Sequence, residues 1–257
     1  MLNQRSVRFV LVLFSMSLIA SCAGSADDEA PLIFAAASVS NVLTDSAEIY
    51  ERETGKQVEF SFGGSIALAN QIATLGAPAD GVFFVGDGPK TILKELSNPV
   101  PSGSIGLVNS LVVIAAADAN HVGTLEDLAV SGERVAIADP ELAPAGQFAR
   151  SALESAGVWD EFAGNLIFTS DVRAALAAVE SGNATYGIVY RTDAFGSDSV
   201  SILSEIFDGY PQIVYVGRSL KNSGKSDEAS SYFEFIAKSA EVKKLFESAG
   251  FTVGFSD

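Results

Sequence analysis

The sequence has little cysteine and little histidine, and each shortage excludes a class of function. Its 257 residues include one cysteine, Cys22, so no disulfide can form within the chain and the fold must be stabilised by its hydrophobic core. The single histidine, His121, lies in a polar loop pattern far from the motifs described below. A histidine-based catalytic triad and a metal site with several histidine ligands are therefore excluded.

Basic residues are also scarce. Sixteen Lys and Arg stand against 32 Asp and Glu, a formal net charge of −16. If Arg5 and Arg8 are removed with a signal peptide, 14 basic residues remain and the net charge becomes −18. Such a surface repels nucleic acid and anionic lipid headgroups, so we expect no nucleic-acid partner. It also repels free anions, and any anion-binding function must overcome that repulsion.

The N-terminus contains an apolar run, Phe9 to Ala20, that is shorter than the roughly 20 residues a membrane-spanning helix needs. With two arginines before it and small residues after it, the run predicts a secretory signal peptide over residues 1–21. Its end at Cys22 resembles the lipobox of bacterial lipoproteins, in which cleavage precedes the cysteine and its sulfur receives a diacylglycerol. Residues 22–30 would then be a polar, lipidated tether on the periplasmic side of the cell membrane. The alternative is an uncleaved anchor helix with an incidental cysteine.

The remaining chain has the composition of a globular protein. Hydrophobic residues make up 48% and charged residues 19% of the sequence. The chain beyond the tether is long enough for one large domain or two small ones.

A repeated unit of strand, small-residue turn and helix organises this chain. The apolar strand Leu32–Ala37 leads through Ser38 into a helix, and the alternating strand 56–62 leads through Ser65 into another. Helix starts expose backbone N–H groups that favour an anion, although most such serines are only helix caps. We also expect a helix over 91–96, one long strand over 107–117 and a single C-terminal helix over 230–249.

The second half repeats the unit. Strands are expected at Val135–Ala138, Leu166–Phe168 and Tyr186–Tyr190, and helices follow the first two of them. Alternating strands and helices predict an α/β architecture with largely parallel sheets, in which ligands bind beyond the carboxyl ends of the strands.

Six motifs stand in one order along the chain and together resemble the periplasmic molybdate-binding proteins of ABC transporters, of the type II solute-binding family. They are Ala35-Ala36-Ala37-Ser38, Gly76-Ala77-Pro78-Ala79-Asp80, Asn109-Ser110-Leu111-Val112, Asp139-Pro140-Glu141 with Pro144-Ala145-Gly146, Asp171-Val172-Arg173, and Gly187-Ile188-Val189-Tyr190 with Asp193-Ala194. The resemblance implies a two-lobed periplasmic-binding-protein fold, each lobe a central sheet flanked by helices, with a ligand cleft between the lobes. It implies lobe I from residues 31–109 plus 206–257 and lobe II from 110–205.

The resemblance also implies the residues that hold the oxyanion: Ser38, Ser65, Ala145, Val172 and Tyr190. The serines would offer hydroxyl and backbone donors, Ala145 and Val172 their backbone N–H groups, and Tyr190 its hydroxyl. Without the resemblance, the serines could be caps, Ala145 and Val172 ordinary first-turn residues, and Tyr190 a core side chain. Arg173 is expected in a salt bridge on its first helical turn rather than at the ligand.

The chain departs from the family pattern at three places. Gly63-Gly64 replaces a more usual alanine-serine or serine-rich turn, Gly81 resembles an insertion, and Val85-Gly86-Asp87 replaces a more common Ser-Ala-Asp. The first departure is expected to loosen the loop that holds Ser65.

The implied function is an extracytoplasmic solute-binding lipoprotein that captures molybdate, and tungstate, for an ABC importer. It is expected to be a monomer without enzymatic activity or a cofactor, to bind molybdenum only as the oxyanion, and to deliver it to a membrane permease. Two alternatives remain: a receptor for sulfate or another tetrahedral oxyanion, and an extracytoplasmic enzyme acting on an oxyanion ester.

Overall fold

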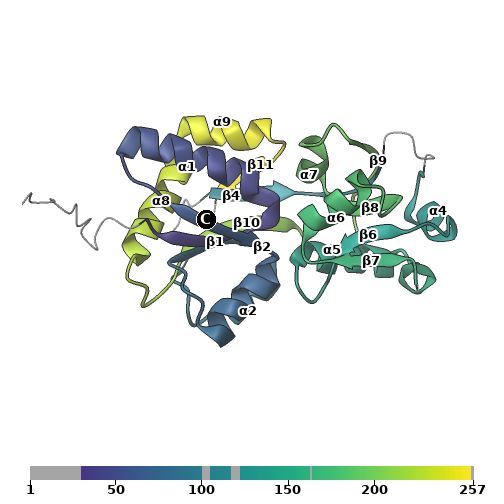
Figure 1. The fold of residues 1–257 in the computed structure, drawn as a ribbon, viewed down its shortest axis with the longest axis horizontal. Helices are drawn as coiled ribbons and strands as arrows, with labels where there is room; N and C mark the ends of the chain where they lie inside the picture. Colours follow the sequence, from purple (N-terminus) through teal and green to yellow (C-terminus); the bar gives the residue numbers. More distant parts are fainter. Residues whose placement is uncertain (1–29, 100–104, 117–121, 163, 256–257) are drawn as a thin grey trace, which may run out of the picture.

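The fold consists of two β-sheets that lie side by side, each packed against its own helices (Figure 1). The structure is a computed structural model that describes residues 30–99, 105–116, 122–162 and 164–255. The predicted signal peptide, Cys22 and His121 lie outside the described residues. Within those four ranges, no helix has the length and apolar character needed to cross a membrane.

The first sheet has six strands in the order β11-β4-β10-β3-β1-β2. Strand β1 pairs in parallel with β2 and β3, whereas β10 runs antiparallel to β3 and β4, and β11 antiparallel to β4. The strands are β1 (Leu32–Ala36), β2 (Glu59–Gly63), β3 (Gly81–Val85), β4 (Ile105–Asn109), β10 (Ile213–Ser219) and β11 (Thr252–Phe255). The helices beside them are η1 (Ala37–Val39), α1 (Ser40–Thr54), α2 (Ser65–Leu75), α3 (Asp87–Ile92), α8 (Ser226–Lys238) and α9 (Ala240–Ser248).

Apolar residues on both faces of this sheet explain why helices cover both. In β1, Ile33 belongs to the main hydrophobic core and its neighbour Phe34 to a second, smaller cluster. In β3, Phe83 and Phe84 divide in the same way. Successive side chains of a strand point to opposite faces, so each strand serves both cores. Helices α1, α8 and α9 pack together (Figure 1). Helix α2 packs with α3.

The second sheet has five strands in the order β7-β6-β8-β5-β9. Strand β6 pairs in parallel with β7 and β8, and β5 runs antiparallel to β8. The strands are β5 (Leu111–Ala116), β6 (Val135–Ala138), β7 (Leu166–Thr169), β8 (Tyr186–Tyr190) and β9 (Val200–Ile206). The helices beside them are α4 (Leu125–Val130), α5 (Pro144–Ser155), η2 (Trp159–Phe162), α6 (Val172–Glu180) and α7 (Arg191–Phe195).

The chain passes between the sheets at Ser110 and again through residues 207–212. The long strand expected over 107–117 is therefore two strands, β4 and β5, one in each sheet. Two polar residues, Asn109 and Ser110, mark the break within the apolar run. The Asn109 side-chain oxygen accepts from the Ser110 N–H at 3.0 Å, and the Ser110 carbonyl oxygen accepts from the Arg191 N–H at 2.9 Å. Two helix-flanked sheets confirm the predicted two-lobed α/β fold. The prediction of largely parallel sheets was wrong, because β4, β5, β9, β10 and β11 all pair antiparallel with their neighbours and both sheets are mixed.

Two helix predictions were wrong in detail. The helix expected over 91–96 lies instead at Asp87–Ile92. It begins after Gly86, which adopts a positive φ of 79°, and the Asp87 carboxylate lies in its first turn. The C-terminal helix expected over 230–249 is two helices, α8 and α9. Ser239 separates them in an extended conformation and caps α9, its hydroxyl accepting from Val242 N–H at 3.3 Å.

Candidate oxyanion-binding pocket

The five residues implied by the resemblance all line one pocket, which has an empty volume of about 200 Å³. Each follows the carboxyl end of a parallel strand: Ser38 and Ser65 follow β1 and β2, Ala145 and Val172 follow β6 and β7, and Tyr190 ends β8. The two groups of parallel strands belong to different sheets, so the pocket lies between the two halves of the molecule. This is the position at which α/β sheets bind ligands.

Two of the three hydroxyl groups in the pocket are buried and have no hydrogen-bond partner among the described residues. They are Ser65 Oγ and Tyr190 Oη, on side chains that are each 1% exposed. The Ser38 hydroxyl differs, since its Oγ lies 2.9 Å from Tyr215 Oη, and either atom can donate. An unpaired buried hydroxyl costs about 1–3 kcal/mol. Two of them in one pocket indicate a polar ligand that would accept their protons.

The Tyr190 hydroxyl keeps its proton at neutral pH. Burial raises the pKa of Tyr190 well above its usual value, and the neighbouring Tyr215 and Asp193 raise this pKa further. The ring of Tyr190 lies edge-on to Tyr215, with the ring centroids 6.0 Å apart. Tyr190 is therefore available as a hydrogen-bond donor.

Backbone donors come from the starts of helices. Ser65 and Val172 are the first residues of α2 and α6, and Ala145 is the second residue of α5. First-turn N–H groups have no acceptor within their own helix, and the positive end of the helix dipole lies beside them. Pro144 has no N–H, so Ala145 carries the first amide of α5. Gly146 is required next, because a Cβ atom there would lie 2.1 Å from the Ala138 carbonyl oxygen at the end of β6.

The two halves approach each other closely at Gly64. A Cβ atom at Gly64 would lie 2.5 Å from the Leu142 carbonyl oxygen and 2.9 Å from that of Ser170. Ala67 N–H, one turn into α2, donates to the same Leu142 oxygen at 3.0 Å. The departure at Gly63-Gly64 thus has a steric reason: a side chain at Gly64 would separate the loop bearing Ser65 from the other half of the molecule.

None of the residues that line the pocket is a lysine, arginine or histidine, and Asp171 is the one carboxylate among them. Its Oδ1 accepts from Ala174 N–H at 3.0 Å, which makes Asp171 the N-cap of α6. Arg173 lies nearby and forms a salt bridge, as expected for it. Its partner, Asp193 in α7 at 2.7 Å, is however far from it in sequence. The pocket can therefore hold an anion through neutral donors.

Sequence reasoning missed three polar groups behind the pocket: the buried Tyr215 and Asp193, and the half-buried Asn109. Asn109 and Asp193 belong to motifs on which the resemblance rests, but the sequence alone assigned neither residue a function. The signal for Asp193 is its place three residues after Tyr190 at the end of a buried strand. The signal for Tyr215 is its place in the alternating pattern of β10, in which every second residue from Ile213 to Ser219 is buried.

Comparisons with known proteins agree with this geometry. Residues 31–252 match the family described as bacterial extracellular solute-binding protein. YvgL of Bacillus subtilis, provisionally named as a substrate-binding lipoprotein of an ABC transporter, is 31% identical over 95% of this chain and 96% of its own. The molybdate-binding protein ModA of Escherichia coli is 32% identical over 89% of this chain and 91% of its own.

Among solved structures, the periplasmic molybdate-binding protein of Azotobacter vinelandii has the same fold. It superposes with a TM-score of 0.73 at 22% identity, over 86% of this chain and 98% of its own. The family match covers nearly all of the chain that follows the predicted tether, and it includes the pocket and every strand of the two sheets except most of β11. The chain belongs to the bacterial extracellular solute-binding proteins.

Proposed function

We propose that this protein captures molybdate, and also tungstate, outside the cytoplasmic membrane and delivers it to the permease of an ABC importer. The observation that carries the proposal is the meeting of Ser38, Ser65, Ala145, Val172 and Tyr190 in one pocket without a basic side chain. The relatedness to ModA, whose name states that it binds molybdate, supports the choice of ligand.

Neutral hydrogen-bond donors are sufficient to bind a dianion. A hydrogen bond to a charged acceptor contributes about 1.5–3 kcal/mol, against about 1 kcal/mol for a neutral pair. Several such bonds in a closed pocket outweigh the repulsion of an acidic surface, which salt screens beyond about 8 Å.

A pocket of donors also selects among oxyanions. Monohydrogen phosphate carries an O–H that needs an acceptor, and leaving it unpaired costs about 1–3 kcal/mol. Sulfate has no such proton, but its S–O bonds are shorter than Mo–O bonds, so a pocket sized for molybdate contacts it poorly. Tungstate has nearly the size of molybdate, and we expect it to bind equally well.

The residues that line the pocket also argue against an enzymatic role. Hydrolysis of an oxyanion ester needs a general base or an activated nucleophile beside the reacting atom. Asp171 is the one carboxylate lining the pocket, and its oxygen atoms already accept from Ala174 N–H and Ser170 Oγ. We infer that the protein binds its ligand and releases it unchanged.

We propose that residues 31–109 plus 206–257 and residues 110–205 act as lobes that close over the oxyanion as a monomer. The two crossings between the sheets, at Ser110 and through 207–212, would be the hinges, with Ile206 itself pairing in the second sheet. The hydrogen bond between Ala67 N–H and Leu142 O would form only on closure.

We propose further that Cys22 is lipidated and anchors the protein on the periplasmic side of the cell membrane. Growth of expressing cells with a radiolabelled fatty acid tests this: the wild type and a Ser25→Ala control should incorporate the label, whereas Cys22→Ser should not. A wild-type protein without label, or a Cys22→Ser variant that carries it, would contradict lipidation of Cys22.

Thermal unfolding with molybdate, tungstate, sulfate and phosphate tests the ligand. A ligand at 100 times its dissociation constant adds about 2.7 kcal/mol to the free energy of unfolding. We expect molybdate and tungstate to raise the melting temperature by similar amounts and sulfate and phosphate to raise it little. Stabilisation by sulfate alone would assign the protein to the sulfate-receptor alternative, and no response to any oxyanion would overturn the proposed function.

A further inference from the structure

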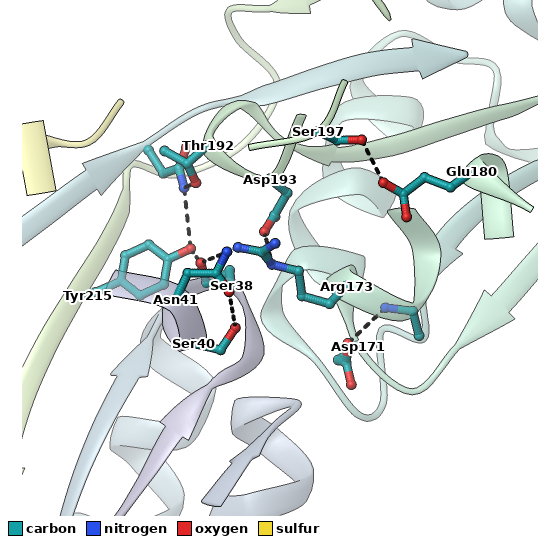
Figure 2. Close-up of polar contacts among 12 residues, drawn as sticks. Ser38, Ser40, Asn41, Asp171, Arg173, Glu180, Thr192, Asp193, Ser197 and Tyr215 are labelled. Carbon is teal, nitrogen blue, oxygen red and sulfur yellow. Dashed lines mark hydrogen bonds and ion pairs between the residues drawn. The ribbon is translucent and has the colours of Figure 1, made fainter. Parts of the chain in front are cut away.

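A buried ion pair lies directly behind the pocket. Arg173, the second residue of α6, places its Nε 2.7 Å from Oδ1 of Asp193 in α7 (Figure 2). The Asp193 side chain is fully buried, and that of Arg173 is 27% exposed. Burying a carboxylate is costly unless a charged partner compensates it, so this pair constrains the position of the guanidinium. Both residues belong to the half of the molecule built on the second sheet.

The other end of the guanidinium reaches the opposite half. Arg173 Nη2 donates to the main-chain carbonyl oxygen of Ser38 at 3.4 Å (Figure 2). Ser38 lies in η1, directly after β1 of the first sheet, and it lines the pocket. A charged donor thus bridges the two halves at one of the proposed ligand residues.

A second polar path links Ser38 to α7. The Ser38 hydroxyl contacts Tyr215 Oη at 2.9 Å, and Asn109 Nδ2 donates to Tyr215 Oη at 3.4 Å and to Thr192 Oγ1 at 2.8 Å. Thr192 is the residue before Asp193. Ser38 is therefore connected to the start of α7 through both its carbonyl and its hydroxyl group.

We propose that Arg173 and Asp193 are positioning residues for ligand retention, which together hold the two lobes closed through Ser38 without touching the oxyanion. This inference rests on the proposed function. A charge-assisted bond made only in the closed arrangement stabilises that arrangement relative to the open one. Its loss should speed ligand release and leave ligand capture by the open form unchanged.

The first test replaces Arg173 by methionine, which keeps much of the length and apolar stem of the side chain. In stopped-flow measurements at pH 8, Arg173→Met should release molybdate about tenfold faster with an unchanged association rate. Arg150→Met is the matched control, because Arg150 pairs with Glu154 on the surface of α5 in the same half of the molecule. An Arg173→Met protein that folds and releases molybdate at the wild-type rate would overturn the proposal.

The second test asks whether Asp193 acts through Arg173. Asp193→Asn should also speed release, and the double variant Arg173→Met with Asp193→Asn should be no faster than Arg173→Met alone. Additive effects would show that Asp193 acts independently of Arg173 and would overturn the positioning role. If Asp193→Asn does not fold, Arg173→Met still decides the retention role.

Lobe closure can also be measured directly. Leu75 in α2 and Val130 in α4 are each 77% exposed and lie in different halves, so Leu75→Cys with Val130→Cys in a Cys22→Ser background provides two labelling sites. With a spin label on each cysteine, double electron–electron resonance measures the distance between the two lobes. Arg173→Met should show a smaller closed population than the labelled protein without this substitution, both with and without molybdate. An unchanged distance distribution would overturn the proposal.

These measurements separate the two proposals. If the wild-type protein binds none of molybdate, tungstate, sulfate and phosphate, the proposed function fails. The ligand-free distance distributions of the labelled protein and its Arg173→Met variant then decide whether the pair holds the lobes together.

Discussion

At the scale of single residues, the pocket depends on hydroxyl groups that the protein itself leaves without partners. Ser65 Oγ and Tyr190 Oη are buried and unpaired, whereas Ser38 Oγ has Tyr215 as a neighbour. A ligand that accepts from Ser65 and Tyr190 recovers the free energy that burying these two hydroxyl groups without a partner costs. These two buried hydroxyl groups without partners therefore indicate a ligand site more strongly than a serine motif in the sequence does by itself.

Tyr190→Phe removes one of these donors and leaves the ring in place. We expect molybdate affinity to fall about 10- to 100-fold, the equivalent of one hydrogen bond to a charged acceptor, while ligand-free stability stays the same or rises slightly. Isothermal titration calorimetry measures the affinity. Tyr232→Phe is the control, since Tyr232 is also fully buried but bonds to Ser46 away from the pocket. Equal affinities of Tyr190→Phe and wild type would remove Tyr190 from the binding site.

Asp193 should make stability depend on pH. Burial raises its pKa from 3.8 to about 7, against the opposing effect of Arg173. Between these pH values the folded state holds a proton that the unfolded state releases, so this group's contribution to the free energy of unfolding decreases as pH rises from about 4 to 7. Asp193→Asn should remove that decrease, which is on the order of a few kcal/mol.

Urea unfolding of wild type and Asp193→Asn at pH 4.5 and pH 7.5 measures the effect. The stability of the variant relative to wild type should increase with pH. A difference between the two proteins that is constant across this range would show that Asp193 titrates alike in the folded and unfolded states.

At the scale of elements, the starts of helices from both halves supply the donors, and one glycine permits their approach. Gly64 has φ of −64° and ψ of 123°, a conformation open to any residue. Its lack of a side chain is needed only because Leu142 and Ser170 place carbonyl oxygens beside it. The requirement thus concerns contact between the lobes and not the fold of either lobe.

Gly64→Ala should therefore weaken molybdate binding by at least tenfold with little change in the ligand-free melting temperature, because the added methyl group obstructs closure alone. Gly224→Ala is the control: it lies in the same half of the molecule away from the pocket, and a Cβ atom there would meet nothing within 4 Å. Titration calorimetry and thermal unfolding of both variants provide the comparison. Wild-type affinity in Gly64→Ala would mean that the lobes need not approach as closely as they do in this structure.

At the scale of the whole molecule, a strongly acidic protein is proposed to capture a dianion. The net charge of −16 repels the ligand at long range, and salt screens this repulsion over a Debye length of about 10 Å at 0.1 M. We expect the association rate with molybdate to rise as sodium chloride increases from 10 to 150 mM, and the dissociation rate to change little. An association rate that falls with salt would indicate a local basic path to the pocket, contrary to its neutral lining.

The sequence by itself determined the α/β class and the residues that follow the parallel strands, because these depend on local periodicity and on short motifs. Periodicity is the same on both sides of Asn109 and Ser110 and therefore predicted one long strand; only the resemblance, which places a lobe boundary between residues 109 and 110, implied that this apolar run is divided. Tertiary structure alone decided why Gly64 is a glycine and that Asp193 pairs with Arg173. Both depend on atoms of residues far apart in the chain: Gly64 meets carbonyl oxygens of the other half, and Asp193 meets Arg173 where α7 packs against α6 within one half.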